Sequence, residues 1–160
     1  MPGGGFFLNN EMDDFAVQPG TPNQFGLVQG ESNAIAPGRR MLSAMAPTIV
    51  LDPQGRVLML VGGRGGPRII TAVVQAIVNV IDHRMSLADA VGAPRIHHQA
   101  LPDIIDYEKG GVPADVVTAL RAMGYSTQPG GTGSLTAIKR TATGWEGLFD
   151  PRKHGLAEGY

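Results

Sequence analysis

Apolar positions along the chain follow two periods, one typical of strands and one typical of helices. Two β-rich runs, residues 47–51 and 56–61, flank residues 52–55, which contain Pro and Gly, and this pattern predicts a β-hairpin. Residues 68–82 are apolar on nearly every side, which predicts a helix that packs on more than one face. The middle of the chain therefore combines a strand pair with a long, largely buried helix.

Shorter elements follow this helix. Ser86 and Asp89 have the spacing of a capping box at a helix start, with Asp in place of the usual Glu, and Gly92 marks the end of that short helix. Residues 113–123 carry apolar side chains at helical spacing and predict a third helix. Short strands are expected at residues 95–99, 104–107, 134–139 and 145–149. The order of elements predicts an α+β fold with helices layered on an antiparallel sheet.

The first part of the chain is rich in loops. Residues 18–40 contain many Gly, Pro, Asn and Ser residues without a hydrophobic period, which predicts an ordered excursion over the surface or across a site. Residues 6–8 are a candidate short strand. A length of 160 residues fits one domain, so we expect a single domain over 1–160, with loops in 1–42 and the sheet and helices in 43–160.

Charge and composition narrow the function classes. The chain has 13 Lys and Arg against 14 Asp and Glu and no basic run, which argues against nucleic acid or an anionic membrane as its main partner. The longest apolar stretch, residues 69–81, is interrupted by Thr71, Gln75 and Asn79, so we do not expect it to span a bilayer. The absence of Cys excludes a disulfide framework and a thiolate metal site.

Acidic and amide side chains crowd together near the start of the chain. Glu11, Asp13 and Asp14 follow Asn9 and Asn10 within six positions. Such a cluster suits a cation, either a metal ion or an ammonium group held by several acceptors. Calcium is the obvious metal, although the alternate acids and central Gly of an EF-hand loop are missing. The alternative is a solvated turn in which Asn and Asp side chains bond their own backbone.

A glycine-rich segment leads from the predicted hairpin into the long helix. Residues 62–66 read Gly-Gly-Arg-Gly-Gly, and bare backbone N–H groups at a helix start form a site for an anion or an oxyanion. The spacing fits neither a P-loop nor a dinucleotide fingerprint. The alternative is a tight turn that needs positive φ.

Ser43 precedes a predicted strand, but no nucleophile elbow surrounds it in the sequence. His97 and His98 are adjacent on one predicted strand, so their side chains point to opposite faces and cannot share a metal.

Several segments taken together resemble a known family. They are FFLNNEMDDF (6–15), LSAMAPTI (42–49), GGRGGPRII (62–70), APRIHHQ (93–99), GTGS (131–134), DPR (150–152) and the closing Gly-Tyr. The set is similar, in the same order, to the small C-terminal subunit of γ-glutamyltransferases, also called glutathione hydrolases. The resemblance covers nearly the whole chain.

The resemblance implies a fold and a chemistry. The fold would be an N-terminal-nucleophile hydrolase αββα sandwich, here incomplete at its N-terminal strands. A Thr exposed by self-cleavage would attack the γ-glutamyl amide, with its own α-amine as general base, and water or an acceptor amine would resolve the acyl-enzyme. Asp14, with Glu11, would bind the substrate α-amino group, and Ser43 the α-carboxylate. The backbone N–H groups of Gly65 and Gly66 would form the oxyanion hole.

Two departures from the family pattern shape the expectations. Ala44 stands where the family usually has a second Ser, so one donor to the carboxylate is missing. No Thr precedes Glu11 and Thr21 lies downstream in a loop, so we assign no nucleophile in this chain. We expect a fragment that is inactive by itself and lacks the first strands, the nucleophile and the large subunit. An unpaired sheet edge would then favour self-association or a partner chain.

The implied partners are glutathione or another γ-glutamyl compound, an acceptor amino acid, peptide or water, and the large subunit or upstream segment of the same precursor. No cofactor and no metal is expected, and the family implies a periplasmic or extracellular location. Alternatives are a non-catalytic or degenerate fragment that retains an amino-acid pocket, a related cephalosporin-type or poly-γ-glutamate acylase, and a calcium module built on Glu11, Asp13 and Asp14.

Overall fold

The computed structural model describes residues 3–5 and 8–159, which fall into two compact units. Residues 1–44 form the first, called the loop unit below, and residues 45–160 form the second, called the sheet unit. The boundary lies two residues beyond the end of the predicted loop region. Phe6 and Phe7, the first residues of the candidate strand at 6–8, lie outside the described residues.

The loop unit is organised by polar contacts. It contains two short 3-10 helices, η1 (Glu11–Asp14) and η2 (Glu31–Asn33). Asn33 is 5% exposed; its amide donates to the carbonyl of Asp14 at 2.7 Å and its side-chain oxygen accepts from the amide of Leu42 at 2.9 Å. The buried side chain of Asn33 thus joins η1 and the backbone at Leu42 to η2. These bonds explain how a segment without hydrophobic periodicity holds a defined shape.

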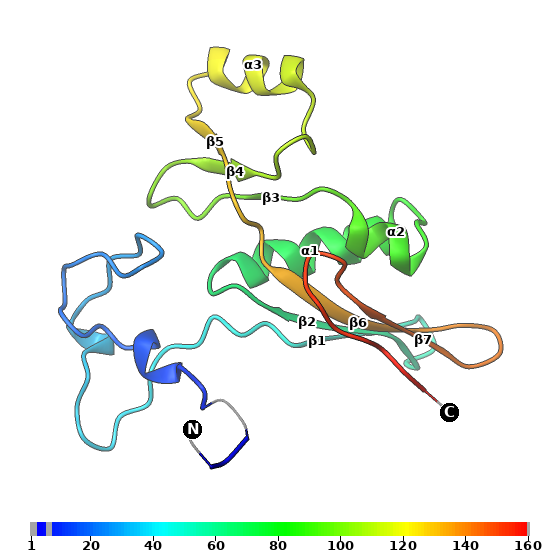
Figure 1. Ribbon diagram of the computed structural model, residues 1–160, viewed down its shortest axis with the longest axis horizontal. Helices are drawn as coiled ribbons and strands as arrows, with labels where there is room; N and C mark the ends of the chain where they lie inside the picture. Colours follow the sequence, from blue (N-terminus) through cyan, green and yellow to red (C-terminus); the bar gives the residue numbers. More distant parts are fainter. Residues whose placement is uncertain (1–2, 6–7, 160) are drawn as a thin grey trace. The chain divides into compact units, whose positions relative to one another are not determined.

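The sheet unit is built on a four-stranded antiparallel sheet. Its strands β1 (Thr48–Leu51), β2 (Val57–Arg64), β6 (Ser134–Arg140) and β7 (Trp145–Phe149) are ordered β1-β2-β6-β7 (Figure 1). The predicted hairpin and the predicted final strand pair are both confirmed. Asp52 closes the hairpin turn, because its carboxylate accepts from the backbone N–H groups of Gln54 at 3.0 Å and Arg56 at 2.9 Å.

Two helices cover one face of this sheet (Figure 1). They are α1 (Arg68–Ile81) and α2 (Leu87–Gly92), both as predicted. Ala72 and Ala76 are fully buried, and their small side chains let α1 lie close to β2 and β6. The Ser86 hydroxyl accepts from the backbone N–H of Asp89 at 3.1 Å and donates to the Asp89 carboxylate at 2.6 Å, which confirms Ser86 as the N-cap. The core lies between these helices and the sheet: Met59, Val61, Ile69, Ala72, Val73, Ala76, Val80, Leu87, Ala90, Val91, Leu135 and Ala137.

A second, smaller sheet contains a pairing that the sequence did not predict. Its strands are β3 (Ile96–His97), β4 (Ile105–Tyr107) and β5 (Thr127–Pro129), and α3 (Ala114–Ala122) connects β4 to β5. The connection through α3 is a crossover, so β4 and β5 run parallel, a pairing that the expectation of one antiparallel sheet did not include. The α+β class itself is confirmed. None of the helices in the described ranges has the length and apolarity needed to cross a membrane.

Candidate functional site

The glycine-rich segment forms a sharp bend between β2 and α1. Gly65 and Gly66 both adopt positive φ, 136° and 60°, which other residues rarely do. A Cβ on Gly65 would lie 2.8 Å from the Cα of Gly133, so any side chain there would push into the neighbouring loop. The carbonyls of Gly65 and Gly66 accept hydrogen bonds from the backbone N–H groups that follow them at the start of α1. Among the turn bonds of the described residues, none is donated by the backbone N–H of either glycine. The bend therefore needs glycine and leaves two backbone donors beside the start of α1.

The loop that faces this bend is held by a buried ion pair. Arg95 and Asp150 both have fully buried side chains, and they meet at 2.8 Å. The Arg95 guanidinium also donates to the carbonyl of Gly133 at 3.1 Å, while the Asp150 carboxylate accepts from the backbone N–H of Leu135 at 2.9 Å. The pair thus secures residues 133–135 directly behind Gly65.

A second carboxylate extends this network toward solvent. Glu108 accepts two hydrogen bonds from Arg152, both at 2.7 Å, and a third from the hydroxyl of Thr132. Burial opposes ionisation of Glu108, but the bonds from Arg152 and Thr132 outweigh it and hold its pKa below the usual value. Asp150 behaves similarly: burial raises its pKa, and bonds from the Arg152 backbone, Arg95 and the Leu135 backbone lower it further than burial raises it. The loop at 132–135 is thus fixed by ionised side chains.

The acidic cluster lies on η1 of the loop unit. Glu11 begins this helix and Asp14 ends it, and both are partly buried. The side chain of Asn9 accepts from the backbone N–H of Glu11 at 3.1 Å, which is the local capping that the turn alternative describes. The carbonyl of Asp14 is bound by Asn33, so the end of η1 is anchored.

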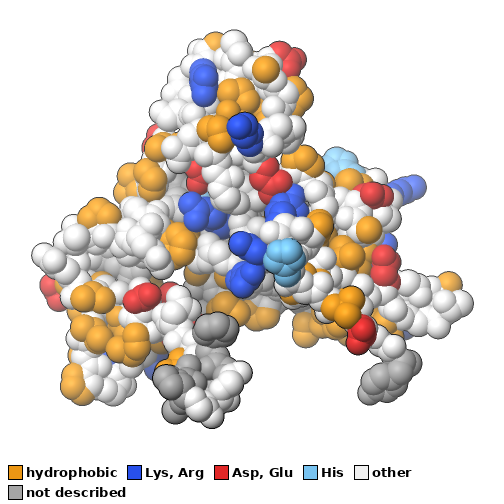
Figure 2. All heavy atoms as spheres, in the orientation of Figure 1, with side chains coloured by type: hydrophobic (Ala, Val, Ile, Leu, Met, Phe, Trp, Pro, Cys, Tyr) orange, Lys and Arg blue, Asp and Glu red, His pale blue; other side chains and the backbone are white. Residues whose placement is uncertain are grey.

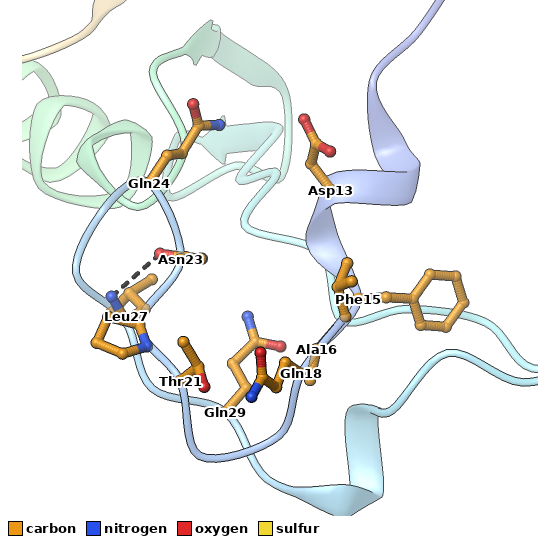
Figure 3. Close-up of a pocket in the computed structure, with 11 residues that line it drawn as sticks. Asp13, Phe15, Ala16, Gln18, Thr21, Asn23, Gln24, Leu27 and Gln29 are labelled. Atoms are coloured by element: carbon orange, nitrogen blue, oxygen red, sulfur yellow. Dashed lines mark hydrogen bonds between the residues drawn. The ribbon is translucent and has the colours of Figure 1, made fainter.

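A cavity of about 330 Å³ lies within the loop unit beside η1 (Figure 3). Its wall includes Asp13 but neither Glu11 nor Asp14, and Figure 3 shows Asp13 and Gln24 on opposite sides of it. Asn23 shapes the far wall, because its side-chain oxygen accepts from the backbone N–H groups of Phe25 at 2.9 Å and Leu27 at 3.1 Å.

The remaining candidates are placed as follows. Ser43 is exposed, one residue before the end of the loop unit, and Ala44 follows it. Gly65 and Gly66 belong to the sheet unit. His97 is buried and contacts Thr71 and Gln99 through its two ring nitrogens, whereas His98 is exposed and contacts Asp103. No cluster of three or more His, Cys, Asp or Glu suited to a metal is found in residues 3–5 and 8–159.

Sequence reasoning assigned no role to the residues that hold the loop behind Gly65. Arg95, Thr132, Asp150 and Arg152 all fall in motifs quoted above, but their contacts join positions 38 and 55 residues apart in the chain. The signal available was the charged residues inside two of these motifs, Arg95 in 93–99 and Asp150 with Arg152 in 150–152. Only the fold shows that these charges meet.

Comparison with known proteins identifies the family. The family model described as gamma-glutamyltranspeptidase matches residues 1–160. The chain is 44% identical over 158 residues to a glutathione hydrolase proenzyme of Pseudomonas aeruginosa, covering 96% of this chain and 28% of the proenzyme. It is 50% identical over 120 residues to that of Escherichia coli, covering 75% of this chain and 20% of the proenzyme. The chain thus spans less than a third of these curated relatives.

Solved structures agree with the sequence match. A gamma-glutamyltranspeptidase from Pseudomonas nitroreducens, complexed with L-DON, superposes with a TM-score of 0.88 at 42% identity, over 100% of this chain and 84% of that chain. This confirms the predicted N-terminal-nucleophile hydrolase type of fold. The resemblance noted from the motifs is likewise confirmed, and the chain belongs to the γ-glutamyltranspeptidase family.

Proposed function

We propose that this chain supplies the substrate-binding and oxyanion-stabilising part of an enzyme that hydrolyses or transfers the γ-glutamyl group of glutathione and related γ-glutamyl amides. The observation that carries the proposal is the bend at Gly65 and Gly66, which leaves backbone donors beside a helix start in a chain of this family. Its relatives at 44% and 50% identity bear the name glutathione hydrolase, which favours this reaction over an acylase of another specificity or a non-catalytic remnant.

The bend would act on the carbonyl of the scissile amide. As a nucleophile adds to that carbon, its oxygen becomes negatively charged, and the amides of Gly65 and Gly66 would donate to it. Removing one such donor typically lowers kcat by about 10²- to 10³-fold. The start of α1 adds its partial positive charge to the same place.

The glutamyl end of the substrate would be held by the loop unit. Asp14, assisted by Glu11, would accept from the α-ammonium group, and Ser43 would donate to the α-carboxylate. Asp13 lines the cavity of the loop unit, whose wall includes neither Asp14 nor Glu11, and it is assigned no contact with the ammonium group. Ala44 cannot donate a hydrogen bond, so carboxylate recognition would rest on fewer contacts than is usual in the family.

The chemistry would proceed through an ester. A Thr hydroxyl loses its proton to its own α-amine, its oxygen bonds to the carbonyl carbon of the γ-amide, and the C–N bond of that amide breaks as the proton passes to the leaving amine. Water or an acceptor amine then attacks the ester and releases the Thr. We assign no residue of this chain as that Thr; a segment of the same precursor ahead of the motifs, at the start of the small subunit, would supply it.

The outer face of the four-stranded sheet favours such a partner. An apolar groove of about 740 Å³ crosses this face, and Ile49 and Ile138 on it are 63% and 43% exposed. A second sheet packed there would bury these side chains and complete the αββα arrangement. Export to the periplasm or the cell exterior belongs to the same proposal and rests on the family resemblance.

The test is release of p-nitroaniline from L-γ-glutamyl-p-nitroanilide by the full product of the gene that contains this chain. We expect turnover, and we expect Asp14→Asn to raise KM at least tenfold because an uncharged amide holds an ammonium weakly. Asp13→Asn is the matched control, one position away. Absence of turnover in the full gene product, or an Asp14→Asn variant with the KM of the control, would refute the proposal.

A further inference from the structure

A cavity with basic walls opens in the sheet unit beside Gly65. It has a volume of about 540 Å³ and is called the basic cavity below. Its walls come from the β2–α1 bend, the residue after β4, the loop that leads into β6 and the segment after β7: Arg64, Gly65, Arg68, Glu108, Gly131, Thr132, Gly133, Ser134, Arg152 and Lys153. Figure 2 shows basic side chains gathered in the middle of the visible face, between the α3 region and the four-stranded sheet.

The cations of the basic cavity outnumber its anions. Four of the lining residues are Arg or Lys and one is Glu. Glu108 is already engaged with Arg152, so it offsets that residue. Among the ion pairs formed by the described residues, none involves Arg64 or Lys153. Two exposed cations are therefore left without a counter-charge at the wall of a concave site, which attracts an anion.

Buried groups set the position of Arg64 and the shape of the cavity walls. The Arg64 guanidinium donates to the hydroxyl of Ser134 at 3.2 Å, and Ser134 is 4% exposed. Thr132 is 3% exposed and donates to Glu108, which fixes the opposite wall together with Arg152. The basic cavity is thus held in shape before any ligand arrives, and a preorganised site binds with a smaller entropic penalty.

The basic cavity adjoins the proposed oxyanion site. Gly65 is part of its wall, Arg64 precedes Gly65 directly, and a Cβ on Gly65 would lie 3.6 Å from the Cβ of Arg68. A group bound in the basic cavity would sit within a few bonds of the reacting carbonyl. The proposed function assigns the α-ammonium and α-carboxylate of the glutamyl group to Asp14 and Ser43, so the group on the other side of the scissile bond has no assigned partner.

We propose that the basic cavity binds the carboxylate of the short peptide that leaves the γ-glutamyl group or accepts it. This inference rests on the proposed function. An extended dipeptide places its carboxylate about 7 Å from its amino nitrogen, a span that fits beside Gly65 within a cavity of ligand size. A guanidinium suits this role, because its planar donors match the two oxygens of a carboxylate. Arg64 and Lys153 are the residues that make the contact.

The experiment compares two acceptors that differ only in that charge. The full gene product transfers the γ-glutamyl group from L-γ-glutamyl-p-nitroanilide to glycylglycine or to glycylglycinamide, at equal concentrations of free amine. We expect the ratio of kcat/KM for the acid over the amide to exceed one. Arg64→Gln and Lys153→Gln should each lower that ratio about two- to fivefold, the usual effect of removing one partner of an exposed ion pair. Arg64→Glu should invert the preference.

The matched control is Lys109→Gln, which removes one nearby exposed charge without altering the wall of the basic cavity. We expect this control to keep the wild-type ratio. Circular dichroism checks that each variant is folded, and the two independent Gln variants guard against the loss of either one. A wild-type ratio near one, or an equal loss with both acceptors in the variants, would overturn the inference. If glycylglycine also fails to accept and the anilide is not hydrolysed, the proposed function fails as well.

Discussion

The buried pair of Arg95 and Asp150 gives the sharpest prediction for stability. Asp150→Asn removes the negative charge that faces a guanidinium with no exposed side-chain surface, at a contact of 2.8 Å. Breaking a buried ion pair by removing one partner typically lowers the free energy of unfolding by about 3–5 kcal/mol, because the other charge is left uncompensated. Glu108 lies 3.9 Å from Arg95 and keeps part of that compensation.

We therefore expect Asp150→Asn to lower the free energy of unfolding by about 3 kcal/mol, the lower end of that range. In a chain of 160 residues such a loss would lower Tm by roughly 6–12 °C, and in the longer full gene product by less. Thermal and urea unfolding of the full gene product, followed by circular dichroism, measures it. Asp103→Asn is the matched control: Asp103 is also paired, with His98, but its side chain is 79% exposed, and we expect less than about 1 kcal/mol.

A double variant separates lost attraction from uncompensated charge. Replacing Arg95 by Met and Asp150 by Leu removes both charges from the core, so it should be more stable than Asp150→Asn alone. The reasoning is refuted if Asp150→Asn and Asp103→Asn unfold at the same temperature. It is also refuted if the double variant is the least stable of the three.

Three further predictions concern other parts of the sheet unit. The pKa values of Asp150 and Glu108 are lowered in the folded state. Their contribution to the free energy of unfolding is therefore complete above the unfolded-state pKa values near 4 and is lost as the pH falls below them. Urea unfolding between pH 7 and pH 3 should show a decline in the free energy of unfolding, and this decline should be smaller in Asp150→Asn. Met59→Ala should lower the free energy of unfolding by about 2–5 kcal/mol, since this side chain is fully buried, and a loss below 1 kcal/mol in urea unfolding would mean that the core closes around the gap. Ser86→Ala should lower it by about 1 kcal/mol through loss of the cap to Asp89, with Ser86→Thr as the variant that keeps the bond, and equal melting temperatures for the two would count against the cap.

The glycine bend and the loop that faces it act as one structural unit. A Cβ on Gly133 would lie 2.9 Å from the carbonyl oxygen of Arg64, just as a Cβ on Gly65 would lie against Gly133. Each backbone therefore limits where the other can lie. Because Arg95 holds the Gly133 carbonyl, a buried charge set well behind the surface positions the backbone donors that we assign to the oxyanion.

Local elements were predictable because each depends on neighbours in the chain. The hairpin closed by Asp52, the apolar helix α1 and the Ser86 cap follow from turn chemistry, periodicity and capping, and all three were correct. Strand β5 was missed because three residues without apolar alternation carry no strand signal. Its parallel pairing with β4 depends on the crossover through α3, which packs against β5, and this is a tertiary effect.

The sequence by itself determined where Gly65 and Gly66 lie and that a strand leads through them into a helix, because that bend is encoded within a few consecutive residues. The sequence also identified the family, because several short motifs occur in the same order along the chain as in that family. Only the tertiary structure decided which charges meet: Arg95 reaches Asp150 across 55 positions, and Arg64 and Lys153 line the same cavity from opposite ends of the sheet unit. The reason is physical, since electrostatic partners are chosen by distance in space, and that distance is set by packing of the whole core.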